Sequence, residues 1–406
     1  MRLLIVTQYF WPEFFLINKL SQKFCNLGHD VTVVTGKPNY PEGEIFEGYI
    51  SSGVTHESYG PVDVIRLPLR PRKKGFVNLV FNYLSFVVSG LYHIPRLLEG
   101  KEFDIILVFA PSPITAAIPA IWFNRKKKFY SAIWVQDLWP ESLVATGHIK
   151  NRITLKIIRL LVGWIYKNVD ILLAQSHSFK KSLTEYVDKK KVIFYPNSVE
   201  NPDNIKEHSA LPLDIEEIFK SGFKIVFTGN IGSAQSIPTL LQSAFDLRDT
   251  DCRFIFIGSG SLVDWAHKKV NDLNLTNVFF LGRMENKYMN SIYRLSDALL
   301  LSLTANEIFS YTIPGKLQAY LASGRPVIAS INGEAADVIN DAGAGVVSPA
   351  ENSKLLSQAI RNFRSLSKSE RDLMGLAGKE YFDKHFDMDV MVKRLETIFN
   401  EKIGDQ

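Results

Sequence analysis

The sequence is poor in cysteine and lacks several motifs that mark well-known chemistries. Its 406 residues include only two cysteines, Cys25 and Cys252, which excludes a disulfide framework and a cysteine-based zinc cluster. The eight histidines show no H-x-x-H or H-E-x-x-H spacing for a metal, and neither a P-loop nor a G-x-S-x-G elbow occurs. Gly258-Ser-Gly260 lacks the third glycine of a dinucleotide fingerprint, so NAD binding has little support.

A recognisable secretion signal is also missing. Met1 and Arg2 lead directly into the apolar run Leu3–Thr7, with no charged region ahead of it. We therefore expect a protein of the reducing cytoplasm. Hydrophobic residues make up 46% of the chain, which is enough for packed cores and excludes a disordered or fibrous protein. The length suggests two or three domains.

Negative charge is scarce in the first half of the chain. Residues 1–200 contain 25 Lys and Arg against 16 Asp and Glu, whereas residues 201–406 contain 22 against 26. Basic residues cluster at 70–74 and again at 125–128. Such clusters fit an anionic membrane surface or a nucleic acid, and they also fit ordinary solvated loops.

Short apolar runs alternate with helical patterns along the whole chain. Leu3–Thr7, a helical pattern at Phe15–Leu27 and Val31–Thr35 predict a βαβ unit and hence a parallel sheet. The polar stretch 201–212 contains two prolines and indicates a linker. The further expected strands are Val62–Leu67, Asp104–Phe109, Phe129–Val135, Asp170–Ala174, Lys191–Tyr195, Lys224–Thr228, Arg253–Gly258, Asn277–Leu281, Ala298–Ser302, Pro326–Ala329 and Gly345–Val347.

These two series predict an α/β protein with two Rossmann-like domains that face each other across a cleft, at residues 1–200 and 213–386. Phe76–Ile94, in the first domain, carries no formal charge over 19 residues and is long enough to span a bilayer. A spanning helix would separate strands of one sheet, so we expect a buried or partly exposed helix. Its basic neighbours would suit a helix that rests on an anionic leaflet; they are Arg72, Lys73, Lys74 and Arg96.

In the second half, two strand ends lead into turns of a kind that binds ligands. Pro314-Gly-Lys316 opens a helix that Ser310 or Thr312 could cap, and its N–H groups with the Lys316 charge predict a diphosphate site. An ordinary capped helix fits the same pattern. The turn Gly229–Gly232 permits close approach of a ligand, although a tight turn without a ligand fits it equally well.

In the first half, two carboxylates follow a buried strand between two tryptophans. Asp137 and Glu141 could hold sugar hydroxyls or act as acid or base, while packing alone could explain Trp134 and Trp139. Glu13 is expected to open the first helix and to face the same cleft. The alternative for Glu13 is a partner of the helix dipole in the first turn.

Several blocks of the sequence are similar, in the same order, to blocks of one enzyme family. They are Thr7–Glu13, Thr35–Pro41, Gln136–Ser142, Gly229–Gln235, and Pro314–Tyr320 followed by Gly324–Pro326. Over essentially its whole length, the chain resembles the retaining glycosyltransferases of family 4, which have the two-domain GT-B fold. It looks closest to bacterial O-antigen and capsule enzymes, the subgroup that includes N-acetyl-L-fucosamine transferases.

The resemblance implies a nucleotide-sugar donor, expected to be UDP-linked, on the second domain and a lipid-linked sugar acceptor on the first. It also implies retention of configuration, no metal or other cofactor, and a last helix at 387–406 that crosses back onto the first domain. The implied donor-binding residues are Gly229, Asn230, Gly232, Gln235, Gly258, Arg283, Met284, Ser310, Thr312, Ile313, Pro314, Gly315 and Gln318. The expected catalytic residues are Asp137, Glu141 and Lys316, and the acceptor-side residues are Glu13, Asn18, Tyr40 and Trp139.

The chain departs from the family pattern around the helix that Pro314-Gly-Lys316 opens. Many members carry two Glu eight residues apart, whereas this chain has Tyr311 at the earlier position and Gln318 near the later one. The nearest acid is Glu307. Gln318 is therefore a candidate for the ribose contact, with Lys316 and Arg283 as cationic partners of the leaving diphosphate.

We predict a glycosyltransferase at the cytoplasmic face of the plasma membrane, in O-antigen, capsule or exopolysaccharide biosynthesis. Its expected partners are a nucleotide sugar, a lipid-linked sugar and an anionic membrane surface, and not a nucleic acid. Two alternatives stay open. A GT-B-fold sugar-nucleotide epimerase would need no lipid acceptor, and the apolar segment Phe76–Ile94 argues against it. A non-catalytic scaffold would bind the donor without releasing a nucleoside diphosphate.

Overall fold

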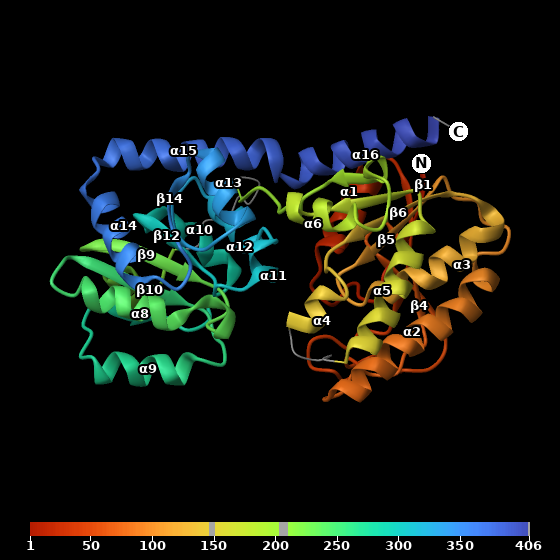
Figure 1. The fold of residues 1–406 in the computed structure, drawn as a ribbon, viewed down its shortest axis with the longest axis horizontal. Coiled ribbons are helices and arrows are strands. Elements are labelled where there is room, and N and C mark those ends of the chain that lie inside the picture. The colour runs from red at the N-terminus through yellow and green to blue at the C-terminus, as the bar shows by residue number, and fades with distance from the viewer. Residues whose placement is uncertain (146–150, 203–209, 405–406) are drawn as a thin grey trace. The chain divides into compact units, whose positions relative to one another are not determined.

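A computed structural model describes residues 1–145, 151–202 and 210–404 of the chain. It divides into two compact units, which we call unit 1 (Met1–Pro196 with Met391–Gln406) and unit 2 (Asn197–Val390). Each unit has its own β-sheet with helices packed around it (Figure 1). Most of the expected linker, 203–209, lies outside the described residues.

Unit 1 is built on a sheet of eight strands in the order β3-β4-β2-β1-β5-β6-β7-β8, parallel except for β3. Its central strands are continuous apolar runs because helices cover both faces, and β5 and β6 are buried along their whole length. The strands are β1 (Arg2–Val6), β2 (Asp30–Gly36), β3 (Thr55–Tyr59), β4 (Val62–Leu67), β5 (Ile105–Ala110), β6 (Tyr130–Val135), β7 (Ile171–Ala174) and β8 (Val192–Phe194). The helices are α1 (Leu16–Asn26), α2 (Phe76–Leu97), η1 (Ile114–Ala116), α3 (Ala117–Lys127), α4 (Glu141–Ala145), α5 (Arg152–Lys167), α6 (His177–Leu183) and η2 (Lys189–Lys191).

Unit 2 is built on an all-parallel sheet in the order β11-β10-β9-β12-β13-β14. The order reverses between β9 and β12, and ligands bind at the carboxyl ends of such strands. The strands are β9 (Phe223–Thr228), β10 (Cys252–Ile257), β11 (Val278–Phe280), β12 (Ala298–Ser302), β13 (Val327–Ser330) and β14 (Gly345–Ser348). The helices are α7 (Leu213–Ile218), η4 (Ser233–Gln235), α8 (Ile237–Asp246), α9 (Val263–Asp272), α10 (Asn286–Leu295), α11 (Glu307–Ser310), α12 (Gly315–Ala322), α13 (Glu334–Ala342), α14 (Ser353–Ser365) and α15 (Lys368–His385).

Every strand expected from the sequence is present, and its ends agree within one residue. The missed strand is β3, an edge strand that pairs antiparallel with β4. Its sequence, THESY, alternates half-buried and exposed positions and has no apolar run. A polar edge strand of this kind carries little sequence signal.

The last helix is α16 (Met388–Gly404), and its residues from 391 onward belong to unit 1. The Phe399 ring stacks on Phe24 at 6.3 Å between centroids, and His29 Nε2 lies 2.8 Å from Glu396 Oε1. Both chain termini therefore belong to the same unit (Figure 1).

α2 connects β4 to β5, and both strands lie in one sheet, as the sequence argument requires. The helix packs against α3, and Gly90 allows the close approach of Pro119. By length and composition alone it could cross a membrane, but only 22% of its most apolar window is buried. It is thus a crossover helix with a largely exposed apolar face.

Candidate functional site

In unit 2, the turn after β9 is shaped by close contact with the turn after β10. Gly229 has a φ of +113° and Gly258 a φ of +142°, conformations that favour glycine. The Gly229 N–H donates to the Ile257 carbonyl at 2.8 Å, and a Cβ on Gly258 would lie 1.8 Å from the Gly229 oxygen. The two turns touch backbone to backbone, and a side chain at position 258 would force them apart.

These turns form one wall of a cavity of about 570 Å³ in unit 2. Arg283 lies in another part of its lining, and the Arg283 Nε donates to Ser259 Oγ at 2.7 Å. Of the predicted donor-binding residues, the cavity is lined by Gly229, Asn230, Gly258, Arg283 and Met284. The other lining residues are Thr228, Ile257, Ser259, Gly260, Asn286, Met289 and Tyr293. The cavity combines exposed backbone, hydroxyl groups and one arginine.

Lys316 lies behind the turn at Gly229. Its Nζ is 4.0 Å from the centroid of the Phe227 ring and would be 3.4 Å from a Cβ placed on Gly229. The ammonium group is screened from solvent, and it has no hydrogen-bond partner within residues 1–145, 151–202 and 210–404. Burial lowers the pKa of Lys316 to about 8. The structure therefore holds a poorly solvated cation next to the cavity, and a bound anion would stabilise its charge.

The helix that carries Lys316 begins differently from the prediction. α12 starts at Gly315 with Pro314 as its N-cap, and no side chain caps it. Thr312 Oγ1 and Ser310 Oγ instead donate to carbonyls of α11, at 3.1 and 2.6 Å. Both hydroxyls belong to the turn of that preceding helix, so the prediction that one of them caps α12 is wrong. The first N–H groups of α12 consequently have no side-chain acceptor from a cap.

Other predicted donor-binding residues do not line the cavity. Gln318 is buried, and its Nε2 donates to the Asn197 carbonyl at 2.6 Å. The side-chain amide that we predicted to contact the ribose is therefore hydrogen-bonded within the protein. Ile313 is buried in the core of unit 2. Gly232 leads into η4, and Gln235 ends it.

Tyr311 and Glu307 stand around the place where the family pattern has a glutamate. The structure joins them by a hydrogen bond from Tyr311 Oη to Glu307 Oε1. Glu307 is the first residue of α11, which Asn306 caps by accepting the Ile308 N–H at 2.9 Å. Glu307, the nearest acid, is thus hydrogen-bonded to Tyr311, which stands where the family pattern has the earlier glutamate.

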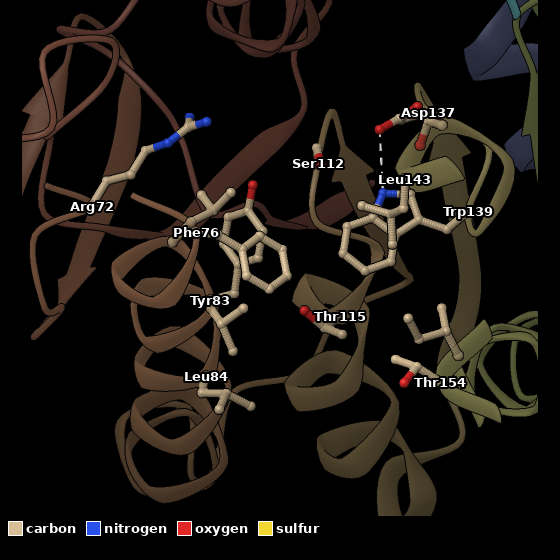
Figure 2. Close-up of a pocket in the computed structure, with 14 residues that line it drawn as sticks. Arg72, Phe76, Tyr83, Leu84, Ser112, Thr115, Asp137, Trp139, Leu143 and Thr154 are labelled. Carbon is tan, nitrogen blue, oxygen red and sulfur yellow. Dashed lines mark hydrogen bonds between the residues drawn. The ribbon is translucent and has the colours of Figure 1, made fainter. Parts of the chain in front are cut away.

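Unit 1 contains a separate cavity of about 480 Å³ between α2, α5 and the turns that follow β5 and β6 (Figure 2). Its lining is mainly apolar and carries two charged residues, Arg72 and Asp137. The full lining is Arg72, Phe76, Leu79, Val80, Tyr83, Leu84, Ser112, Thr115, Asp137, Trp139, Ser142, Leu143, Thr154 and Ile158.

Asp137 is the carboxylate of this pocket. It accepts a hydrogen bond from Trp139 Nε1 at 3.2 Å, and Ser112 and Ser142 also line the pocket. Burial raises the pKa of Asp137, while the hydrogen bond from Trp139 acts in the opposite direction. An oriented carboxylate of this kind can bind a hydroxyl or exchange a proton with it.

Glu141, the second predicted carboxylate, lies outside the pocket lining. It begins α4, and its Oε1 lies 3.7 Å from Arg159 Nη2 on α5. Trp139 is buried against the pocket, with Tyr83 at 6.4 Å between ring centroids. Of this sequence block, the structure thus brings Asp137 and Trp139 together and leaves Glu141 in a surface ion pair.

Glu13 is 2% exposed and lies inside unit 1. Its Oε1 accepts the N–H groups of Asn39 and Tyr40, both at 2.8 Å, and its Oε2 accepts that of Phe10 at 3.1 Å. α1 begins three residues later, so both expectations about the helix start are wrong. Asn18 Nδ2 donates to the Glu13 carbonyl at 2.6 Å. Glu13 and Asn18 hold the loop after β1, and Tyr40 stays 37% exposed.

Comparison with known families agrees with this division of the chain. Residues 17–198 match the glycosyl transferase 4-like domain, and residues 222–365 match glycosyl transferases group 1. The protein is a glycosyltransferase. Each family match covers mainly one of the two units, the first running two residues into unit 2, and contains the residues that line that unit's cavity.

The glycosyltransferase is similar to proteins of known sequence and structure. It is 25% identical to the probable glycosyltransferase WbjE of Pseudomonas aeruginosa, over 71% of this chain and 72% of that protein. It is 24% identical to the putative colanic acid biosynthesis glycosyl transferase WcaI of Escherichia coli K12, over 80% and 82%. The structure of Anabaena HepE in complex with UDP superposes with a TM-score of 0.68 at 13% identity, covering 99% and 100%. This likeness confirms the two-domain GT-B fold.

Most of the residues that line the unit 1 pocket of the glycosyltransferase were not predicted from the sequence. Tyr83 and Leu84 lie in the apolar segment Phe76–Ile94 that we noted in the sequence. Nothing in the sequence indicates that their side chains point toward a pocket. Ser112 and Thr115 follow β5 in the stretch APSPIT, whose small and polar residues after a buried strand are a usable signal for a binding turn.

Proposed function

We propose that the protein transfers a sugar from a nucleoside diphosphate sugar, with UDP as the expected nucleotide, to a lipid-linked sugar in bacterial surface polysaccharide biosynthesis. The observation that carries the donor side is the unpartnered Lys316 ammonium beside a glycine-walled cavity. The name of the relative WcaI refers to colanic acid biosynthesis, and the solved HepE structure contains UDP. Both support the same class of reaction.

The difficult step is departure of the nucleoside diphosphate. The bond between the sugar C1 and the diphosphate oxygen breaks, a bond from C1 to the acceptor oxygen forms, and the acceptor hydroxyl loses its proton. Negative charge grows on the diphosphate. Lys316, Arg283 and the first N–H groups of α12 stabilise that growing charge more than they stabilise the bound donor.

Unit 1 provides the acceptor side in this proposal. Asp137 is oriented by the hydrogen bond from Trp139, and it binds the attacking hydroxyl or takes its proton. We further propose retention of configuration, no requirement for a metal, and N-acetyl-L-fucosamine as a candidate sugar. The exposed apolar face of α2 beside Arg72, Lys73 and Lys74 supports binding at the cytoplasmic face of an anionic membrane.

Titration with a panel of nucleotides tests the donor side directly. We expect UDP to raise the melting temperature, since a ligand at 100 times its Kd adds about 2.7 kcal/mol of stability. In Lys316→Ala, turnover should fall at least tenfold, because removing one such contact typically costs about 2.7–4 kcal/mol in the transition state. Lys268→Ala, an exposed lysine of the same unit, should behave like wild type.

The alternatives predict other outcomes of the same assay. An epimerase would convert the free nucleotide sugar in the absence of any acceptor. A scaffold would bind UDP but would release none from the nucleotide sugar when the lipid-linked sugar is added. If no nucleoside diphosphate binds, or Lys316→Ala turns over at the wild-type rate, the proposed function is wrong.

A further inference from the structure

The unit 1 pocket changes character from one end to the other. Figure 2 shows Arg72, Ser112 and Asp137 at one end, and Leu84 and Thr154 towards the other. The wall contributed by α2, α4 and α5 is mainly apolar; its apolar residues include Phe76, Leu79, Val80, Leu143 and Ile158. A volume of about 480 Å³ lies within the usual range of ligand pockets, about 300–1,000 Å³. The pocket is therefore suited to an amphiphilic molecule.

Arg72 gives the polar end a positive charge. Its guanidinium lies 5.3 Å from the centroid of the Tyr40 ring, and no ion pair engages it in the described part of the chain. Tyr83 and Ser112 also line the pocket, and the charges of Arg72 and Asp137 both act on the Tyr83 hydroxyl. An unpaired arginine in a partly apolar setting is well suited to a phosphate or diphosphate.

The apolar end continues into helix faces that no part of the described chain covers. On α5, Ile153, Ile157 and Leu160 recur at helical spacing and are 61–72% exposed. On α2, an exposed stripe of the same spacing consists of Val77, Phe81, Leu84 and Val88. Leu84 belongs both to the stripe and to the pocket lining. A chain that leaves the pocket at this end thus meets an apolar surface.

We propose that this pocket binds the lipid diphosphate portion of the sugar acceptor: the diphosphate at Arg72, the first part of the apolar chain between α2 and α5, and the attached sugar towards Asp137. Such an acceptor joins a polar head of hydroxyls and phosphates to hydrocarbon, and the pocket likewise joins a polar end at Arg72 and Asp137 to an apolar wall. This inference rests on the proposed function, which it deepens by assigning the acceptor's lipid to a site.

Calorimetric titration with farnesyl diphosphate tests the assignment without any turnover. Wild type should bind farnesyl diphosphate and should bind inorganic diphosphate at least tenfold more weakly, since the latter has no chain. Val80→Trp adds bulk at a position that lines the pocket and is 37% exposed, so the helix tolerates it, and we expect at least tenfold weaker binding. Arg72→Gln should weaken binding to a similar extent.

The matched control is Val88→Trp, on the same helix but outside the pocket lining and 66% exposed. It should bind farnesyl diphosphate like wild type, and all variants should keep wild-type affinity for UDP and a wild-type circular dichroism melt. No binding by wild type, or wild-type binding by Val80→Trp, overturns the assignment. Equal weakening in Val80→Trp and Val88→Trp also overturns it, since it would indicate adsorption on the exposed face of α2. Loss of UDP binding by wild type would instead refute the donor side.

Discussion

The two units of this glycosyltransferase build different sites at the carboxyl edges of similar sheets. In both, the strand order reverses at the middle of a parallel sheet, between β1 and β5 in unit 1 and between β9 and β12 in unit 2. Unit 2 lines its cavity with backbone at Gly229 and Gly258 and places one buried lysine behind it. Unit 1 lines its pocket with side chains from α2 and α5 and orients one carboxylate, Asp137.

The difference shows that the fold determines the place of a site, while the residues after the strands determine its chemistry. A compact anion such as a diphosphate needs close approach to N–H groups, which glycine turns permit. An amphiphile needs an apolar wall and a few oriented polar groups, which only side chains provide. The two sites are therefore expected to respond to different substitutions.

Gly258→Ala is expected to have the largest effect. The new Cβ would lie 1.8 Å from the Gly229 carbonyl oxygen at a φ of +142°, so the two turns must separate. A displacement of about 1 Å at a ligand site can cost about 100-fold. We expect UDP affinity to fall by about that factor, measured by calorimetry, while binding at the unit 1 pocket is unchanged.

Gly343→Ala separates this clash from the backbone cost alone. Gly343 also has a positive φ, +60°, but nothing in the described chain lies within 4 Å of its Cβ position. It should lower the melting temperature and leave UDP affinity intact. If Gly258→Ala keeps wild-type UDP affinity, the glycine-walled cavity is not the donor site.

The regular part of the fold could be predicted from the sequence because continuous apolar runs and glycine ends mark buried parallel strands. Strand β3 (Thr55–Tyr59) could not, because its alternating half-buried pattern is that of a polar edge. The start of α12 was displaced for a local reason. The Ser310 and Thr312 hydroxyls donate to carbonyls of α11, and Pro314 is the N-cap residue of α12.

The candidate sites were predictable only in part. A glycine turn and a lysine at a helix start are sequence-local, so Gly229 and Lys316 were found. The direction of a side chain depends on tertiary packing: Gln318 turns inward to Asn197, and Glu141 pairs with Arg159. The pocket between α2 and α5 brings together segments far apart in the sequence, so no local sequence pattern predicts it.

Asp137→Asn tests the unit 1 side and should have the next largest effect. The amide keeps the size of the carboxylate but cannot accept a proton, and loss of an acid or base typically costs about 100-fold or more in rate. We expect turnover with the lipid-linked acceptor to fall by about 100-fold while the Kd for UDP is unchanged. Steady-state kinetics and UDP titration on the same preparation measure both.

Glu141→Gln compares the other carboxylate of the same sequence block. The Glu141 side chain lies outside the pocket and forms an ion pair with Arg159. The Arg159 side chain is 66% exposed. Exposed pairs contribute about 0–1 kcal/mol, so we expect turnover within a few-fold of wild type. The reverse ranking of the two variants would move the acceptor site away from the pocket.

The pH dependence of ligand binding distinguishes Lys316 in unit 2 from Arg72 in unit 1. Burial lowers the pKa of Lys316 to about 8 from the usual value near 10.5, so the free protein loses this charge as the pH rises through 8. A bound diphosphate favours the protonated amine. UDP affinity should therefore be constant between pH 7 and 8 and then fall about tenfold per pH unit above 8, with proton uptake on binding.

Calorimetry in buffers of different ionisation enthalpy measures that uptake directly. Lys316→Arg supplies a group that stays charged over this range, so its UDP affinity should not fall above pH 8. The affinity for farnesyl diphosphate in unit 1 should likewise not change with pH over this range, because its proposed site carries an arginine and no lysine. A flat profile for UDP in wild type would mean that Lys316 does not contact the diphosphate. A falling profile for both ligands would mean that a group outside the two sites titrates.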